Sequence, residues 1–168
     1  MSKENYLELA MEKGKMSVKA CNNKDFCEQL EKNGLMVNNY ISSLEGSYLV
    51  AIERANMNGQ TSWKKALEII KYYKIPLNIF LVYFDLRRRG RRVWEGSRDN
   101  TLISETANLK KFEVLVLGEG NSITTSQIAE WSNLAVADSH IPVIAIVDKN
   151  GEITYYESRL FYFNLLSE

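Results

Sequence analysis

The stretch FEVLVLG, residues 112–118, is an almost unbroken apolar run that only Glu113 interrupts. Such runs are typical of strands that are covered on both faces at the centre of a sheet. A second apolar run, PVIAIV at 142–147, predicts another buried strand. Between them, TTSQIAEWSNLAVAD predicts a capped helix with an apolar face made of Ile128, Trp131, Leu134 and Ala135.

Shorter strands are predicted on both sides of this centre. RRVWEG, residues 91–96, and TLISETA, residues 101–107, predict two strands joined by a turn near Asp99 and Asn100. After residue 147, DKNG predicts a hairpin turn with Asn-Gly at its tip, and EITYYES returns as a strand. The C-terminal half is thus predicted as a twisted mixed sheet of about five strands with two helices.

The N-terminal half combines short strands with helices. Strands are predicted at 16–20 and within LMVNNYISSL, and helices within DFCEQLEKNG, within GSYLVAIERA and after Thr61. A further helix begins at Pro76, which suits a first helical turn, and ends at Gly90. The fold class is therefore α+β or mixed α/β. We predict a small N-terminal α+β domain over 1–75 and a C-terminal mixed-sheet domain over 76–168.

Composition limits the partners and the location of the chain. Its 168 residues are 45% hydrophobic and include 21 basic and 21 acidic residues. The chain can therefore bury a core, but it cannot coat nucleic acid through net charge. No signal peptide and no apolar segment of membrane-spanning length stands out, so we expect a cytoplasmic protein with no membrane contact.

The chain has two cysteines, Cys21 and Cys27, and a single histidine, His140. This set cannot form a four-ligand zinc site from cysteine and histidine alone. In a cytosolic protein we expect two free, partly buried thiols rather than a disulfide. We expect neither a metal nor a cofactor.

Five of the chain's eight arginines lie within six positions, 87–92, around the end of the helix predicted before Gly90. One interpretation is a solvated helix end, where cations interact favourably with free carbonyl groups. The other is a local contact with RNA or with a partner protein. We assign that contact to Arg88, Arg91 and Arg92 and expect Arg87 or Arg89 to be structural.

Two phrases of the sequence resemble archaeal tRNA-intron (tRNA-splicing) endonucleases. FLVYFDLRRRGRRVWEG, residues 80–96, is similar to a family phrase in which an apolar helix ends in V-Y-x-D-L-R-x-R-G and runs into a strand. IPVIAIVDKNGEITYYE, residues 141–157, is similar to the family's A-(I/V)-V-D-x-x-G-(D/E)-I-T-Y-Y. With the helical region SLEGSYLVAIERANMNG and SWKKALEII, the likeness extends over residues 40–160. The resemblance implies the family's fold and a part in removing introns from precursor tRNA at bulge-helix-bulge sites.

The resemblance also implies a chemistry. The family cleaves precursor tRNA without a metal and leaves a 2′,3′-cyclic phosphate and a 5′-hydroxyl. This reaction needs a base for the ribose hydroxyl, an acid for the leaving oxygen and a cation for the phosphorane. The family uses a tyrosine, a histidine and a lysine, and their positions in this chain fall near Thr106, Lys111 and His140.

None of the three positions holds the family's residue. No tyrosine occurs between Tyr83 and Tyr155, and the histidine position falls in a lysine pair. No lysine or arginine occurs from Thr124 to Val147. A single histidine beside a strand is more often structural than catalytic. We therefore expect no active site in this chain.

The leading hypothesis is a structural subunit of a tRNA-splicing endonuclease, which serves assembly and RNA positioning while a paralogous subunit carries the catalytic triad. One alternative is an active, metal-independent endonuclease with relocated residues such as Lys110, Lys111 or Tyr156. Another is a non-enzymatic RNA-binding scaffold protein. A metal-dependent nuclease is disfavoured, because no lysine stands two residues after Glu113 on the central strand.

Assembly is expected at the DKNG hairpin. Family members resemble one another in an acidic loop at this turn, which inserts into a basic cleft of a neighbouring subunit. The acidic positions here are Asp148 and Glu152, although Asp148 has an alternative role as the cap of its own turn. Further contacts are expected from Tyr155, Tyr156 and the apolar tail 160–163. We expect an (αβ)₂ heterotetramer with the catalytic paralogue, and a homodimer as the alternative for the chain alone.

Overall fold

The computed structural model describes residues 5–158. The chain forms two compact units, the first ending at Phe80 and the second beginning at Leu81. This division lies five residues after the predicted boundary at 75, inside helix α4 (Leu77–Arg88). Each unit holds one mixed five-stranded sheet, so the α+β class predicted from the sequence is confirmed.

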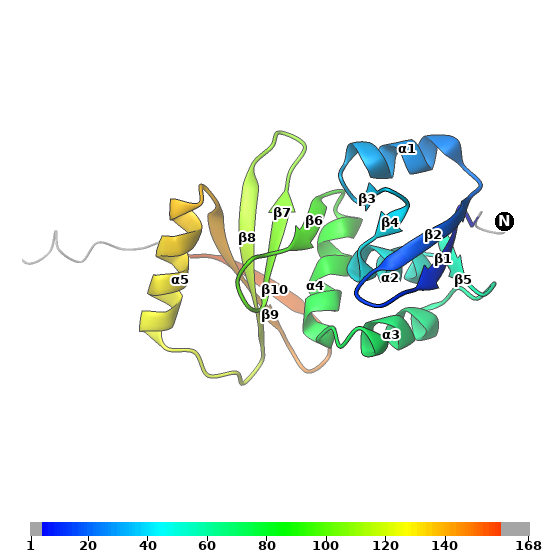
Figure 1. Ribbon diagram of the computed structural model, residues 1–168. Coiled ribbons are helices and arrows are strands. Elements are labelled where there is room, and N and C mark those ends of the chain that lie inside the picture. The colour runs from blue at the N-terminus through cyan, green and yellow to red at the C-terminus, as the bar shows by residue number, and fades with distance from the viewer. Residues whose placement is uncertain (1–4, 159–168) are drawn as a thin grey trace, which may run out of the picture. The chain divides into compact units, whose positions relative to one another are not determined.

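The sheet of the first unit has the order β3-β4-β2-β1-β5 (Figure 1). Its strands are β1 (Leu7–Met11), β2 (Met16–Cys21), β3 (Met36–Val37), β4 (Tyr40–Ile41) and β5 (Ala55–Met57). The strand pair β1–β5 is parallel and the other pairs are antiparallel. The helices of this unit are α1 (Lys24–Lys32), α2 (Ser43–Ala51) and α3 (Trp63–Tyr72).

Helix α2 forms the core of the first unit. Ser42 accepts a hydrogen bond from the Glu45 N–H and so begins the helix, and every residue from 44 to 51 is buried. Gly46 allows the sheet to approach closely, because a β-carbon there would lie 2.5 Å from the Met16 sulfur. The core therefore depends on a small residue in the middle of α2.

Two strands of the first unit were not predicted. The helix predicted within GSYLVAIERA ends at Ala51, and Glu53 adopts a left-handed backbone with φ of 63°. The chain then forms β5, which pairs with β1 through Leu7 and Ala55. β1 carries a local signal, because LELAM alternates and pairs with the adjacent strand β2. β5 could not be recognised locally, because it has three residues and pairs with β1, which lies far away in the sequence.

The prediction of two free thiols is wrong, because Cys21 and Cys27 form a disulfide. Cys21 ends β2 and Cys27 lies near the start of α1, which places their α-carbons 6.7 Å apart. This separation is within the range that a disulfide spans. The tight connection from strand to helix, capped by Asn23, brings the two sulfurs together.

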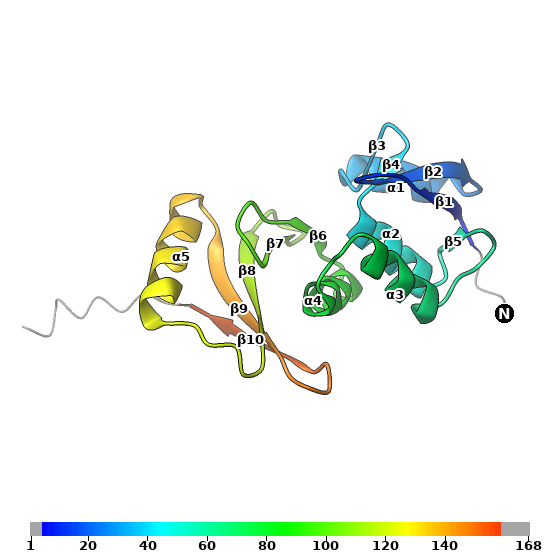
Figure 2. The same ribbon diagram turned by 60° about the horizontal axis from the view of Figure 1, so that its bottom comes forward.

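The sheet of the second unit has the order β10-β9-β8-β7-β6 (Figures 1 and 2). Its strands are β6 (Arg92–Glu95), β7 (Thr101–Glu105), β8 (Lys111–Gly118), β9 (Ile141–Val147) and β10 (Ile153–Glu157). The stretch FEVLVLG lies in β8, the central strand, as predicted. Helix α5 (Thr125–Ala137) connects β8 to its parallel neighbour β9, and the remaining pairs are antiparallel.

Alternation along β8 assigns the two faces of this sheet. Glu113, Leu115 and Leu117 point to the face that α5 covers, where the Trp131 indole bonds to Glu113. Phe112 and Val114 point to the other face, where Leu86 of α4 lies beside them. Of the predicted apolar face of α5, Trp131 and Ala135 are buried, but Leu134 is 46% exposed and Ser132 is buried instead.

Within residues 5–158, no helix combines the length and the apolar character needed to cross a membrane.

Candidate functional site

The three catalytic positions implied by the resemblance lie at one end of the second unit's sheet. Glu105 pairs with Lys111, and Phe112 pairs with Ile141. Thr106 therefore follows the end of β7, Lys111 begins β8, and His140 precedes β9. Three adjacent strands thus bring the three positions to the same end of the sheet.

Thr106 is engaged in the turn between β7 and β8. Its hydroxyl donates to Asn108 Oδ1 at 2.5 Å and accepts from the Lys110 N–H at 3.2 Å. An aliphatic hydroxyl in such a turn is not a proton-transfer group near neutral pH, unlike the side chains that usually serve in acid–base catalysis. The position where the family has its tyrosine is therefore structural here.

Lys111 is engaged with its own sheet. Its Nζ lies 3.9 Å from Glu105 Oε2 and 5.9 Å from the centroid of the Trp94 ring. Glu105 is buried and also forms an ion pair with Arg92. Lys111 is thus part of a cross-strand charge group and does not replace the family's histidine.

His140 reaches a buried carboxylate. Its Nδ1 lies 3.1 Å from Glu113 Oε1, and the Glu113 side chain is 1% exposed. Glu113 also accepts hydrogen bonds from Arg98 Nη1 at 2.7 Å and from Trp131 Nε1 at 2.6 Å, and Arg98 Nη2 donates to Asp138 at 2.6 Å. These five residues are called the Glu113 cluster below.

The Glu113 cluster connects β8 to three other parts of the second unit. It joins β8 to α5 through Trp131, to the segment after α5 through Asp138 and His140, and to the turn before β7 through Arg98. A buried carboxylate is costly unless charge and hydrogen bonds compensate it. The hydrogen bond to Asp138 raises the pKa of Arg98 against the opposing effect of desolvation, and attraction to Glu113 adds to the rise. The guanidinium is therefore a permanent cationic partner.

The same cluster contains potential metal ligands. One ligand atom each of Glu113, Asp138 and His140 lie within 4.8 Å of one another. Carboxylate and imidazole ligands at such spacing suit a divalent cation. However, Arg98 already donates to both carboxylates, so its guanidinium occupies the cationic role and an ion would have to displace it. The arrangement is a structural cluster in which Arg98 bridges two carboxylates.

The sequence indicates Glu113 only as a possible nuclease acid and Trp131 only as part of an apolar helix face, and it does not single out Arg98 or Asp138. A signal was present, since a single carboxylate in an apolar central strand requires a buried partner. The partners of Glu113 could not be identified, because Arg98, Trp131 and His140 lie 15, 18 and 27 residues from it along the chain.

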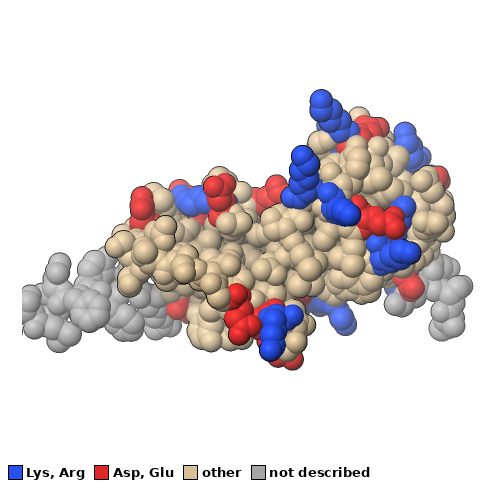
Figure 3. Space-filling model, turned by 90° about the horizontal axis from the view of Figure 1, so that it is seen from below, with Lys and Arg blue, Asp and Glu red and all other residues tan. Residues whose placement is uncertain are grey.

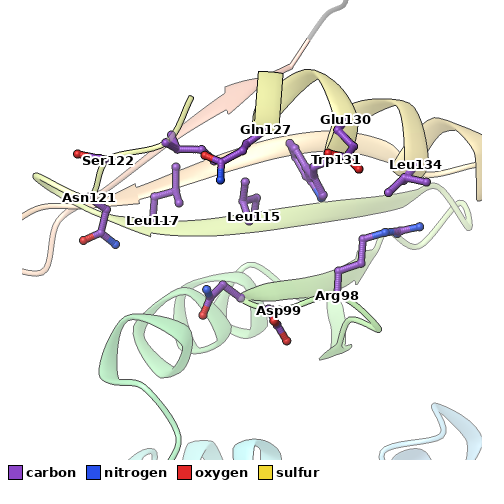
Figure 4. Close-up of a pocket in the computed structure, with 12 residues that line it drawn as sticks. Arg98, Asp99, Leu115, Leu117, Asn121, Ser122, Gln127, Glu130, Trp131 and Leu134 are labelled. Carbon is purple, nitrogen blue, oxygen red and sulfur yellow. The ribbon is translucent and has the colours of Figure 1, made fainter. Parts of the chain in front are cut away.

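A groove of about 570 Å³ lies beside the cluster, between α5, β8 and the turn before β7 (Figure 4). Its apolar lining includes Leu115 and Leu117, and its polar lining includes Asn100, Asn121, Ser122 and Gln127. Its charged lining residues are Arg98, Asp99 and Glu130, one cation against two anions. An RNA backbone is attracted by an excess of cations. The groove therefore does not attract phosphate.

The contacts of the arginines differ in part from the predicted ones. Arg92, predicted to contact RNA, is paired with the buried Glu105 of the neighbouring strand. Arg88 lies 5.9 Å from the Phe84 ring and Arg91 lies 5.1 Å from the Phe112 ring. Over residues 5–158, neither Arg88 nor Arg91 forms an ion pair, so these two remain the candidates for an external anion.

Arg87 and Arg89, of which one or the other was predicted to be structural, both bond within the second unit. Arg87 Nη1 donates to the Arg91 carbonyl at 3.2 Å. Arg89 Nε donates to Asp85 Oδ2 at 2.9 Å. Both contacts stabilise the end of α4, where Gly90, with φ of 79°, allows the chain to leave the helix.

Tyr155, predicted for assembly, is bonded to α4. Its hydroxyl donates to Asp85 Oδ2 at 2.6 Å, and Arg89 lies 5.5 Å from its ring centroid. Burial, and then the bond to the Asp85 carboxylate, raise the pKa of Tyr155 far above its ordinary value. Tyr156 points to the opposite face and is 53% exposed, so it is the tyrosine that a partner can reach.

The hairpin between β9 and β10 separates its two acidic residues. Asp148 Oδ1 accepts hydrogen bonds from the N–H groups of Asn150 and Glu152 at 2.8 and 2.9 Å, so Asp148 caps its own turn. The side chain of Glu152 is exposed and has no bond within the described part of the chain. The apolar tail 160–163 lies outside the described residues.

No model of a known protein family matches the chain, and a search of curated proteins finds no significant relative.

Proposed function

We propose that this chain is a non-catalytic subunit of a tRNA-splicing endonuclease. It assembles with a paralogous subunit that carries the tyrosine, histidine and lysine, and it helps to position precursor tRNA at bulge-helix-bulge sites. One observation carries the proposal. Thr106, Lys111 and His140 lie at the same end of the sheet, and the side chain of each contacts another residue of the second unit.

The two sequence segments that carry the resemblance contact each other in the second unit. The first phrase supplies Asp85, Arg89 and the Gly90 turn at the end of α4. The second phrase supplies Tyr155, whose hydroxyl bonds to Asp85 across 70 positions of sequence. This contact supports the interpretation that the family's framework is kept while its chemistry is missing.

RNA positioning is assigned to Arg88 and Arg91. The chain has no net charge, and positive and negative side chains are interspersed on the face drawn in Figure 3. An RNA contact must therefore be local. Arg88 and Arg91 flank Gly90 at the end of α4 and form no ion pair within residues 5–158, so their charge is available for phosphate.

Assembly is assigned to the hairpin and the edge strand β10. Glu152 has a free carboxylate at the turn, where a basic cleft of a partner subunit can bind it. Tyr156 offers an exposed ring on an edge strand. An (αβ)₂ heterotetramer with the catalytic paralogue is the assembly that we propose.

The purified chain, alone and mixed with its catalytic paralogue, is incubated with bulge-helix-bulge RNA. We expect co-elution of the two subunits on a sizing column and cleavage by the mixture only, with 2′,3′-cyclic phosphate ends. Cleavage by the chain alone would contradict the proposal. Absence of both co-elution and any effect on cleavage would contradict it as well.

A second candidate is an active endonuclease with relocated residues. Its groups would be Lys110, Lys111 and Tyr156. Tyr156 stands on β10 opposite Ile144, and β9 separates it from β8, which begins at Lys111. These groups do not lie together at one end of neighbouring strands as Thr106, Lys111 and His140 do. The geometry therefore favours the non-catalytic subunit. An RNA-binding scaffold is the remaining outcome if RNA binds but no paralogue associates.

A further inference from the structure

The disulfide between Cys21 and Cys27 has two unequal sulfur environments. Cys21, the last residue of β2, is exposed, whereas Cys27, near the start of α1, is 8% exposed. Thiol–disulfide exchange requires an attacking thiolate to reach one of the two sulfurs directly. Cys21 is therefore the cysteine at the surface, where a thiol in solution can approach, and Cys27 is the buried one.

We propose that Cys21 is a thiol-exchange site for a small thiol of the glutathione class and that Cys27 is its resolving residue. The sulfur of the incoming thiolate bonds to Cys21 Sγ, and the bond between the two protein sulfurs breaks. The electron pair leaves on Cys27 Sγ, which then takes a proton from solvent. This step exchanges one disulfide for another and needs no other oxidant or reductant.

The mixed disulfide has two onward paths. The Cys27 thiolate can attack Cys21 Sγ again, which releases the small thiol and restores the protein disulfide. Alternatively, a second small thiolate attacks the bound thiol and is oxidised with it to the small-molecule disulfide, which leaves both protein cysteines reduced. The balance between the two paths depends on how close Cys27 stays to Cys21.

Local contacts hold Cys27 in place when the disulfide is open. Asn23 Oδ1 accepts a hydrogen bond from the Phe26 N–H at 3.0 Å and caps α1. The Phe26 ring lies 5.1 Å from the Tyr6 ring, and Leu30 is buried. These contacts keep the start of α1 beside the end of β2, so Cys27 competes with thiols from solution.

The exchange changes the attachment of α1. Cys27 and Leu30 are the buried residues of this helix, so the disulfide is a large part of its attachment to the first unit. Elements with few buried contacts open most readily. Exchange at Cys21 therefore sets how often α1 opens. This inference is independent of the proposed function, because it concerns only the first unit.

The direct test uses the unaltered full chain in its oxidised state. The chain is incubated with reduced glutathione, quenched with acid, alkylated and mapped by peptide mass spectrometry. We expect glutathione on Cys21 in at least about tenfold excess over Cys27, with the alkyl label on Cys27. Adduct mainly on Cys27, equal adducts, or alkylation of both cysteines before glutathione is added would overturn the proposal.

Two matched variants test the resolving role with oxidised glutathione as the probe. Cys27→Ser should accumulate the Cys21 adduct, because no thiol remains to release it. Cys21→Ser should form adduct on the buried Cys27 at least about tenfold more slowly. Equal rates would overturn the assignment, and the mapping on the unaltered chain decides the question if a variant fails to fold.

Hydrogen exchange tests the effect on α1. Reduction should accelerate amide exchange in residues 24–32, whereas α3 serves as the internal control and should not change. Unchanged exchange in α1 would overturn the link between the disulfide and this helix.

Discussion

Glu113 is a single residue on which the placement of a whole helix depends. Its buried carboxylate is hydrogen-bonded to a guanidinium, an indole N–H and an imidazole. The indole belongs to α5 and the imidazole to the segment after it. The Glu113 carboxylate is therefore committed to holding α5 on β8.

The change Glu113→Gln tests this role. The neutral amide leaves Arg98 without its buried anionic partner, and breaking a buried ion pair costs about 3 kcal/mol of the free energy of unfolding. Urea denaturation measures the loss. Glu130→Gln, on the exposed side of α5, is the control and should change the free energy of unfolding by less than about 0.5 kcal/mol. Equal effects of the two changes would show that Glu113 is not a key attachment.

Tyr155 predicts a dependence of stability on alkaline pH. Its folded pKa is raised by burial and by Asp85, so the folded chain holds the phenol proton more tightly than the unfolded chain does. The resulting stability is complete below the ordinary tyrosine pKa of about 10 and is lost as the pH rises above it, by at most about 1.4 kcal/mol per pH unit.

The change Tyr155→Phe should remove that part of the slope. Denaturation midpoints between neutral and strongly alkaline pH measure it. Tyr73, whose pKa is also raised by burial, contributes a separate slope, so Tyr73→Phe is the comparison. A variant Tyr155→Phe with the same alkaline slope as the unaltered chain would show that the phenol is not protected in the fold.

At the scale of elements, the structure confirms those that carry their own start and stop signals. Asn23 and Thr124 cap α1 and α5, and the Asn150-Gly151 turn joins β9 to β10. Of the missed elements, β5 depends on long-range pairing, since Ala55 pairs with Leu7, whereas β1 also pairs with the adjacent β2. Long-range proximity also hid the Glu113 cluster. The disulfide was missed for another reason: its cysteines are only six residues apart, but the expected cytosolic location argued against pairing them.

The cap of α5 gives a prediction at this scale. Thr124 and Gln127 form a reciprocal capping box at the start of the helix. Thr124→Ala should lower the free energy of unfolding by about 1 kcal/mol. Thr125→Ala, one position later and without a cap bond, is the control. If thermal denaturation finds the two variants equal, the capping box contributes nothing to stability.

At the scale of the whole molecule, a neutral chain can bind RNA only through a local group of cations. Arg88 and Arg91 are the candidates at the end of α4, whereas Arg92 is paired with Glu105. Arg88→Ala with Arg91→Ala should weaken RNA binding by the assembled complex and reduce the slope of affinity against salt by about 1 to 2. Lys24→Ala, an exposed change on α1, is the control. Fluorescence anisotropy over a salt series measures both, and equal slopes would return the arginines to a solvated helix end.

The central claim is that this chain contributes no catalytic group to RNA cleavage. The most direct test removes the catalytic side chains of the other subunit. A paralogue that lacks its tyrosine, histidine and lysine is mixed with this chain, and cleavage of bulge-helix-bulge RNA is followed under single-turnover conditions. The account predicts that the mixture with the intact paralogue cuts the RNA and that the mixture with the inactivated paralogue forms the same assembly but does not cut. Cleavage by the second mixture would contradict the account, because the catalytic residues would then have to lie in this chain.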